Sequence, residues 1–127
     1  YGQTLKVNEK IDVYSFGVIL LELTTGKEAN DGNEHSSLAE WALQYALGGD
    51  PIEDVLDKDV KKPMYMNEMT SVFKLGLWCT SRLPSNRPSM MEVCQMLLRC
   101  GPAMVVGTRK SGQDVVDHLP LLKLESV

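Results

Sequence analysis

The stretch of the sequence that most restricts the fold is IDVYSFGVILLEL, which covers residues 11–23. Its apolar residues do not keep to one side, and yet an aspartate, Asp12, stands near its start. A membrane span needs about 20 consecutive apolar residues, whereas this run is shorter and is interrupted by Ser15, Gly17 and Glu22. The run is also too long for an ordinary strand. The sequence therefore predicts a central helix that is enclosed by neighbours on several faces.

Capping residues mark the two ends of this predicted helix. Either Asn8 or Asp12 can begin it, because short polar side chains accept hydrogen bonds from the free N–H groups of a first helical turn. Gly26 can end it, because glycine readily adopts the left-handed conformation that closes many helices. We therefore expect the helix to start at one of the two polar residues and to close at Gly26.

Capping boxes predict two further helices. Ser37 and Glu40 have the required spacing, with a hydroxyl at the cap and a carboxylate three residues later. The helix that follows them is stopped by the sequence GGDP. Ser89 and Glu92 repeat the pattern, and the helix after them is stopped by a Gly-Pro pair.

The remaining segments complete an all-α fold class of four helices and a tail. A third helix is predicted to begin at Asn67 and to end at Pro84. We expect residues 52–63 to form a charged linker that can hold one short turn before Pro63. Residues 1–101 are expected to form one partial domain, and residues 102–127, which show no sustained period, a mobile tail. Helical spacing predicts that the inward faces are Leu38, Trp41, Ala42, Tyr45 and Ala46, then Met69, Val72, Phe73, Gly76 and Thr80, with Leu77 beside them, and finally Met90, Val93, Cys94 and Leu97.

The charge and the cysteines limit the function classes. The net charge is −4 and no long basic block occurs, so we expect no nucleic-acid partner and no membrane contact by this segment. The cysteines Cys79, Cys94 and Cys100 show no CxxC spacing and lie in predicted helices. We expect them to be reduced and to pack as small apolar residues.

Two motifs, in this order, resemble those of eukaryotic protein kinases. KIDVYSFGVILLEL is similar to the D-x-[WY]-S-x-G segment that opens the large helix of the C-terminal lobe, and RLPSNRPSM resembles the arginine-containing turn before the last core helix of that lobe. With SLAEWA and FKLGLWCTS between them, the sequence is most similar to the leucine-rich-repeat receptor-like serine/threonine kinases of plants. The residues that carry the two motifs are Asp12, Tyr14, Ser15, Gly17, Arg87 and Pro88.

The resemblance implies structural roles for two charged residues. In the family, the aspartate that matches Asp12 lies beneath the catalytic loop and accepts hydrogen bonds from its backbone amides. The arginine that matches Arg87 pairs with the glutamate of an Ala-Pro-Glu triplet, and Tyr1-Gly2 resemble the residues that directly follow this triplet. Without the motif around it, Arg87 would be interpreted as an ordinary surface arginine.

The motifs that perform phosphoryl transfer are not found in this sequence. The family uses a G-x-G-x-x-G loop, V-A-I-K, H-R-D and D-F-G to hold the nucleotide and the metal ions and to position the substrate hydroxyl, and none of them occurs here. We therefore expect no catalytic, cofactor-binding or metal-binding residue in this chain, which would be inactive by itself. ATP and magnesium would belong to the longer kinase, which the resemblance implies is a single-pass plasma-membrane protein with this segment in the cytoplasm.

Two alternatives and several weaker patterns remain at this stage. The chain could act as a non-catalytic docking module through residues 27–46, or it could be a truncated gene product.

Asp31 to Glu34 lack the ligand spacing of a calcium loop, and Asp54, Asp57 and Asp59 are expected to be solvated. Separated from the N-terminal lobe and the catalytic loop, the central helix is expected to expose a large apolar patch, with aggregation or molten behaviour.

Overall fold

The computed structural model describes residues 2–29 and 37–101, and for residues 2–7 it describes the backbone alone. Within these ranges the chain is all-α and no strand occurs, which confirms the predicted fold class. The predicted tail at 102–127 and most of the loop before the second helix lie outside the described residues. The elements are α1 (Gly2–Thr25), α2 (Leu38–Leu47), η1 (Ile52–Asp54), η2 (Pro63–Tyr65), α3 (Met66–Cys79), η3 (Pro84–Asn86) and α4 (Met90–Arg99), where η marks a short 3₁₀ turn.

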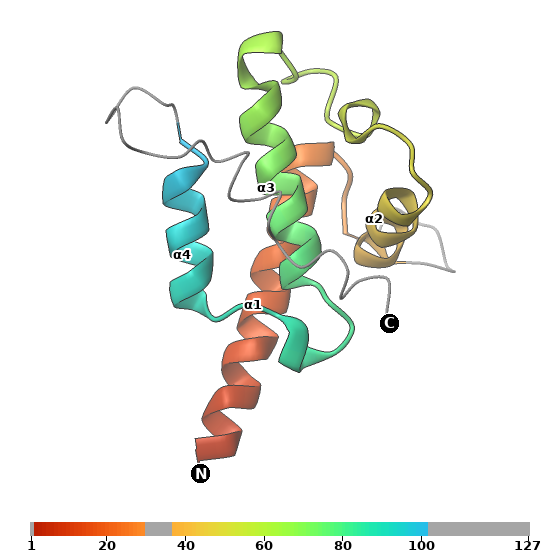
Figure 1. Ribbon diagram of the computed structural model, residues 1–127. Coiled ribbons are helices and arrows are strands. Elements are labelled where there is room, and N and C mark those ends of the chain that lie inside the picture. Colours follow the sequence, from red (N-terminus) through yellow and green to blue (C-terminus); the bar gives the residue numbers. More distant parts are fainter. Residues whose placement is uncertain (1, 30–36, 102–127) are drawn as a thin grey trace.

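Helices α1 and α3 form the centre of the fold, with α4 on one side and α2 on the other (Figure 1). The two central helices approach most closely at two glycines. A Cβ atom on Gly17 would lie 2.5 Å from the Cβ atom of Cys79, and one on Gly76 would lie 2.9 Å from a methyl group of Leu21. The Leu21 methyl belongs to a flexible side chain that can move, whereas the Cys79 Cβ is fixed to the backbone. No side chain fits at Gly17 unless the helices separate, so Gly17 of the kinase-like motif is a packing residue.

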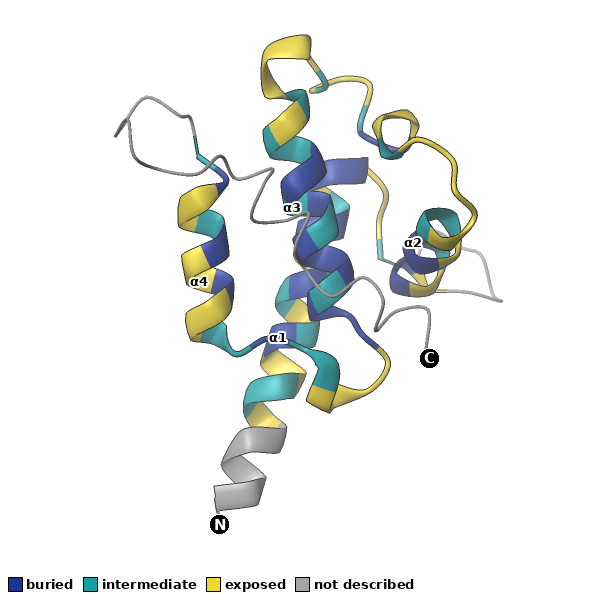
Figure 2. Cartoon of the chain, in the orientation of Figure 1, coloured by how far each residue is buried: buried dark blue, intermediate teal, exposed yellow. Residues whose placement is uncertain are grey.

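Two hydrophobic clusters lie on the two sides of this central pair, and the buried residues in Figure 2 follow them. The first cluster joins α1 and α3 to α2, and its buried members are Leu21, Leu38, Ala39, Ala42, Leu43, Val55, Leu56, Phe73 and Leu77. The second joins them to α4, and its buried members are Val13, Leu20, Leu75, Cys79, Val93, Met96 and Cys100. Because α3 contributes to both clusters, it is buried on more faces than its sequence pattern predicts.

The predicted ends of α1 are half right. Gly26 closes the helix as expected, with a φ angle of 73° and an N–H that donates to the carbonyl of Glu22 at 2.9 Å. The start is wrong, because α1 begins at Gly2 and not at Asn8 or Asp12. Between Gly2 and Asp12 the sequence has no proline and no second glycine, so nothing in the chain breaks the helix before the expected caps.

The inward faces of α3 and α4 also differ in part from the prediction. Leu75 and Cys79 of α3 are buried but were not assigned to its inward face. In α4, Cys94 is exposed, whereas Met96 and Cys100 are buried in its place. Val93, Met96 and Cys100 keep the i, i+3, i+7 spacing of one helical face, so the helical repeat holds and only the choice of Cys94 for that face was wrong.

Residues 52–63 hold the short turn that was predicted before Pro63, but they also contribute to the core, which was not predicted. They contain η1, a second turn begins at Pro63, and Val55 and Leu56 are buried in the first cluster. The backbone N–H of Asp57 donates to the carbonyl of Thr24 at 2.8 Å, which fixes this segment to the end of α1. The many charged residues around Val55 and Leu56 hid their core role in the sequence pattern.

One face of α1 is not covered by any described element. Ile11, Ile19 and Leu23 are 54%, 48% and 68% exposed, and Asp12 and Ser15 are exposed on the same side of the helix. The predicted exposed apolar surface is therefore present on this helix. No helix in the described ranges is long and apolar enough to cross a bilayer.

Candidate functional site

The candidate site lies at the turn between α3 and α4, where the second kinase-like motif is found. The turn η3 places Arg87 in an extended conformation, and the N–H of Arg87 donates to the carbonyl of Pro84 at 3.0 Å. Trp78 of α3 holds the turn through its indole N–H, which donates to the carbonyl of Asn86 at 2.8 Å. Pro88 is fully buried directly after the arginine. The turn is therefore a fixed platform for the Arg87 side chain.

The Arg87 side chain bonds to two backbone carbonyls at once, one just before its own turn and one in α1. Its Nε donates to the carbonyl of Ser81 at 2.8 Å, and its Nη1 donates to the carbonyl of Lys10 at 3.0 Å. Lys10 returns a bond, because its Nζ donates to the carbonyl of Arg87 at 2.7 Å. These reciprocal bonds join positions that lie 77 residues apart in the sequence. The guanidinium is charged and planar, so it can hold two carbonyls in fixed directions.

The aromatic ring of Tyr14 completes the surroundings of this guanidinium. The central carbon of the Arg87 guanidinium lies 4.7 Å from the centroid of the Tyr14 ring, within the range of a cation–π interaction. Burial lowers the pKa of Arg87, and Tyr14 opposes this change. Arginine keeps its charge over the physiological range in spite of such a change. The site therefore presents a fixed, half-buried positive charge.

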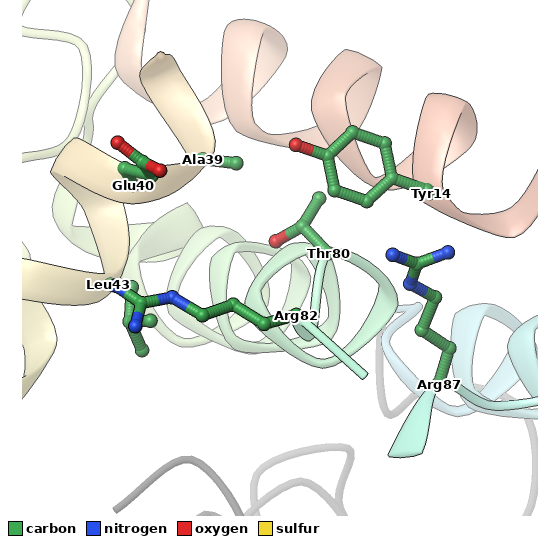
Figure 3. Close-up of a pocket in the computed structure, with 7 residues that line it drawn as sticks. All are labelled: Tyr14, Ala39, Glu40, Leu43, Thr80, Arg82 and Arg87. Carbon is green, nitrogen blue, oxygen red and sulfur yellow. The ribbon is translucent and has the colours of Figure 1, made fainter. Parts of the chain in front are cut away.

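A pocket of about 310 Å³ opens beside Arg87. Figure 3 shows the Arg87 guanidinium directed toward the Tyr14 ring, while the side chain of Arg82 extends toward Leu43 of α2. The residues that line the pocket are Tyr14, Ala39, Glu40, Leu43, Thr80, Arg82 and Arg87. With two guanidinium groups and one carboxylate in its lining, the pocket suits an acidic side chain better than a basic one.

The motif residues are not all brought together by the fold. Tyr14 and Arg87 are in contact, and Pro88 and Gly17 position the elements around them. Asp12 and Ser15 are exposed on the uncovered face of α1. Asp12 is thus not buried here as the resemblance implies, because no described element covers that side of the helix. It still lies on the same turn of α1 as Lys10 and Tyr14, which both contact Arg87.

Sequence reasoning missed the residues that join α1 to the turn. Besides Lys10 and Ser81, Glu9 takes part, because its Oε1 accepts from the N–H of Met90 at 3.0 Å at the start of α4. A carboxylate at this end of a helix is favoured by the helix dipole. Most of these bonds are made by backbone groups, which are the same in every residue and so leave no pattern in the sequence. The only signal was the Glu-Lys pair directly before the apolar run.

The described part of the chain offers no evident place for a metal ion. No group of three or more His, Cys, Asp or Glu side chains gathers in it with the arrangement of a metal site. The calcium-like residues at 31–34 and His35 lie outside the described residues.

Comparisons with known proteins agree with the motifs at this site. No family model matches the chain. Among curated proteins, it is 42% identical over 105 residues to MDIS1-interacting receptor like kinase 1 of Arabidopsis thaliana, which is 80% of this chain and 10% of that protein. It is 47% identical over 100 residues to receptor-like protein kinase 5 of the same plant, and this match covers 76% of this chain and 10% of that protein. Over about three quarters of its length or more, the chain is therefore similar to one part of the plant receptor-like kinases.

A third relative extends the similarity along nearly the whole sequence. The chain is 42% identical over 123 residues to the LRR receptor-like serine/threonine-protein kinase SIK1 of Oryza sativa subsp. japonica, which is 96% of this chain and 12% of that protein. The match therefore reaches beyond residue 101, where the resemblance found from motifs ends. The kinase-like chain spans about a tenth of the length of these relatives.

Proposed function

We propose that this chain is the helical part of the C-terminal lobe of a receptor-like serine/threonine kinase. In its complete form, the kinase would transfer phosphate from ATP, with magnesium, to serine or threonine hydroxyls of protein substrates. The observation that carries the proposal is the Arg87 turn, which binds α1 beside the D-x-Y-S-x-G motif in a chain similar to receptor-like kinases. The complete protein would span the plasma membrane once, with this segment in the cytoplasm.

The role of this chain in that enzyme is to hold other parts in position. The pocket beside Tyr14 and Arg87 would receive the carboxylate of the activation segment, which the resemblance identifies as a glutamate. The positive lining of the pocket supports this role, because a half-buried guanidinium is stabilised by an opposite charge. The uncovered face of α1, with Asp12 in it, would carry the catalytic loop.

The chain by itself would have no phosphotransferase activity and no appreciable affinity for nucleotides. The proposal follows from the missing motifs, since every residue type that binds ATP or the metal in the family would lie elsewhere. Transfer of radiolabelled phosphate from ATP to a generic serine/threonine substrate tests it, with an intact kinase domain as the positive control. Transfer above background by the purified chain, with contaminating kinases removed, would contradict the proposal.

The kinase assignment itself needs a separate test. The transcript can be sequenced upstream of the Tyr1 codon. In-frame H-R-D and D-F-G motifs would support the proposed enzyme, whereas an in-frame stop codon would favour the truncated product.

A non-catalytic docking role is the second candidate. It is favoured by α2, which has a partly buried aromatic pair, Trp41 and Tyr45, outside the motif-bearing helices. A sharp thermal transition of a monomeric chain would support it, because a docking module has to be folded without the rest of a kinase domain.

A further inference from the structure

A second hollow lies on the other face of α2 from the Arg87 pocket. It is a groove of about 500 Å³ between α2, the end of α1 and the segment that follows η1. The Arg87 pocket uses Ala39, Glu40 and Leu43 of this helix, whereas the groove uses Trp41 and Tyr45. The lining residues that matter here are Lys27, Trp41, Tyr45, Asp54, Asp57 and Asp59. The proposed kinase scaffold assigns no task to this groove.

One wall of the groove already carries a cation. The centroids of the Trp41 and Tyr45 rings lie 5.7 Å apart, with a tilt of 38° between the ring planes. The ammonium of Lys27, an exposed residue just after α1, lies 4.6 Å from the centroid of the Trp41 ring. A tryptophan face attracts cations through its quadrupole. The contact with Lys27 therefore indicates that this wall of the groove accepts a positively charged group.

Acidic side chains also line the groove. Asp54, Asp57 and Asp59 contribute carboxylates, against the ammonium groups of Lys27 and Lys58. Asp57 has a structural task, because its Oδ1 accepts from the N–H of Asp59 at 2.9 Å. Asp54 is exposed and has no such bond among the described contacts. Asp59 is also exposed, but Asp54 is the charge that acts most strongly on Tyr45, the ring beside Trp41, so we take Asp54 as the carboxylate that would meet an incoming cation.

The ionisation of Tyr45 agrees with a negative potential around the groove. Its hydroxyl donates to the carbonyl of Pro51 at 3.0 Å. The pKa of Tyr45 is raised by partial burial first, and then by the negative charges of Asp54, Asp50 and Glu53. The same potential disfavours phosphate groups of nucleic acids and lipids, so the groove suits a basic segment of a protein.

We propose that this groove binds an arginine side chain of a partner protein, stacked on Trp41 and paired with Asp54. Arginine is preferred to lysine because its planar guanidinium stacks on an aromatic ring and pairs with a carboxylate in the same plane. The arginine takes the place of the Lys27 ammonium, which is an internal competitor for the ring. The interaction needs no phosphoryl transfer, so it is independent of the proposed kinase function.

The test uses a short glycine peptide that carries one arginine, and the same peptide with neutral citrulline. Binding to the complete chain is followed by NMR at the indole N–H groups of Trp41 and Trp78, where Trp78 is an internal control because it is bonded in the Arg87 turn. We expect the arginine peptide to shift the Trp41 signal alone and citrulline to leave it unchanged. Equal shifts with both peptides, or no shift that depends on arginine, would overturn the proposal.

Three exposed positions make the test independent of Trp41, which also packs against the core. Asp54→Asn should weaken binding about three- to fivefold, as expected for the loss of a direct ion pair at an exposed carboxylate. Glu53→Gln removes the same charge one residue away from the groove and should change affinity less than about twofold, because exposed charges act weakly. Lys27→Met frees the ring and should tighten binding about threefold.

The pattern among these variants decides the outcome. Equal weakening by Glu53→Gln and Asp54→Asn would indicate a general attraction of the peptide to negative charge, and it would overturn the proposed site. Unchanged or weaker binding by Lys27→Met would also overturn it. If the chain alone gives no dispersed NMR spectrum, the same titration is made in the longer kinase that carries these residues. Binding without ATP separates this result from that of the phosphotransfer experiment.

Discussion

Arg87 is a structural residue at the level of single hydrogen bonds, since it joins the turn before α4 to the carbonyl of Lys10 in α1. We expect Arg87→Lys to lower the free energy of unfolding by about 1–2 kcal/mol, because one ammonium cannot bond both carbonyls and stack on Tyr14. Urea unfolding measures the loss. Arg82→Lys is the matched control, because Arg82 lines the same pocket but is exposed. Equal effects of the two substitutions would show that the paired bonds of Arg87 contribute little.

Gly17 is required by contact between helices rather than by backbone conformation. In an open helix, Gly→Ala adds about 1 kcal/mol of stability. Here the new methyl would lie 2.5 Å from Cys79 Cβ and 2.8 Å from a methyl of Thr80. We therefore expect Gly17→Ala to cost on the order of 1–3 kcal/mol, as other overpacked sites do. Thermal unfolding measures the change, and Gly48→Ala, which meets only ordinary contacts of 3.4 Å, should be nearly neutral.

The three cysteines differ in their expected reactivity. Cys79 has no exposed surface, and burial raises its pKa to about 12 from an ordinary value of 9.0. Cys94 is exposed. Since the thiolate is the reactive form, a thiol reagent at pH 8 should modify Cys94 rapidly and Cys79 only on unfolding, and Cys94→Ser should remove the fast phase. A fast phase that survives this substitution would contradict the burial of Cys79 and Cys100.

The raised pKa of Cys79 also gives a direction for stability against pH. The unfolded thiol loses its proton near pH 9.0, whereas the folded thiol keeps it up to about pH 12. The stabilisation from this residue is therefore complete below about pH 9 and is lost as the pH rises toward 12. Urea unfolding of the wild-type chain and of Cys79→Ala between pH 8 and pH 10 separates this contribution from that of the lysines and tyrosines.

At the scale of elements, the sequence predicted the helices whose ends carry capping groups and missed what depends on distant partners. Ser89 and Glu92 form both bonds of the predicted capping box, and Gly26 ends α1 as expected. These signals are local, so they can be read from a single sequence. The start of α1 has no such signal, and its prediction was wrong.

The sequence predicted the arginine of the candidate site, but not the groups that bind it. The motif pointed to Arg87, but the carbonyls of Lys10 and Ser81 that hold it are backbone groups. Backbone acceptors are the same for every residue type, so no pattern could have identified them. The pairing of Arg87 with a carboxylate and the place of Asp12 under a catalytic loop stay predictions.

The segment around η1 behaves as a core element in spite of its charged composition. Leu56 is fully buried between α1, α2 and α3, whereas Val60, four residues later, is half exposed. We expect Leu56→Ala to lower the free energy of unfolding by about 2–5 kcal/mol, because it leaves a cavity in the first cluster. Val60→Ala should cost less than about 0.5 kcal/mol, as exposed substitutions usually do. Denaturant unfolding compares them, and similar losses would mean that the segment is not fixed to the core.

At the scale of the whole molecule, the elements that the structure describes leave one side of α1 uncovered. The central helix is packed by α3, α2 and α4 on its other faces (Figure 2). The stripe that remains is apolar at Ile11, Ile19 and Leu23, with Asp12 and Ser15 beside them. In a protein kinase lobe this face of α1 would be covered. Asp12 is exposed here because it lies on this face.

The uncovered stripe should make the chain associate with itself. Ile19 and Leu23 are one helical turn apart, and contiguous apolar surface favours association or aggregation. We expect the chain to bind an apolar dye and to form concentration-dependent oligomers. The double substitution Ile19→Glu and Leu23→Glu should reduce both without lowering the melting temperature, because neither side chain belongs to the two clusters.

Leu98→Glu provides the matched control for this last experiment, because Leu98 is 74% exposed but belongs to α4 and not to α1. This change should leave the association unchanged, as measured by light scattering after size-exclusion chromatography. A monomeric wild-type chain with a sharp thermal transition would contradict the expectation. It would mean that α1 is stable with its apolar side in water, and it would favour the docking module over the kinase scaffold.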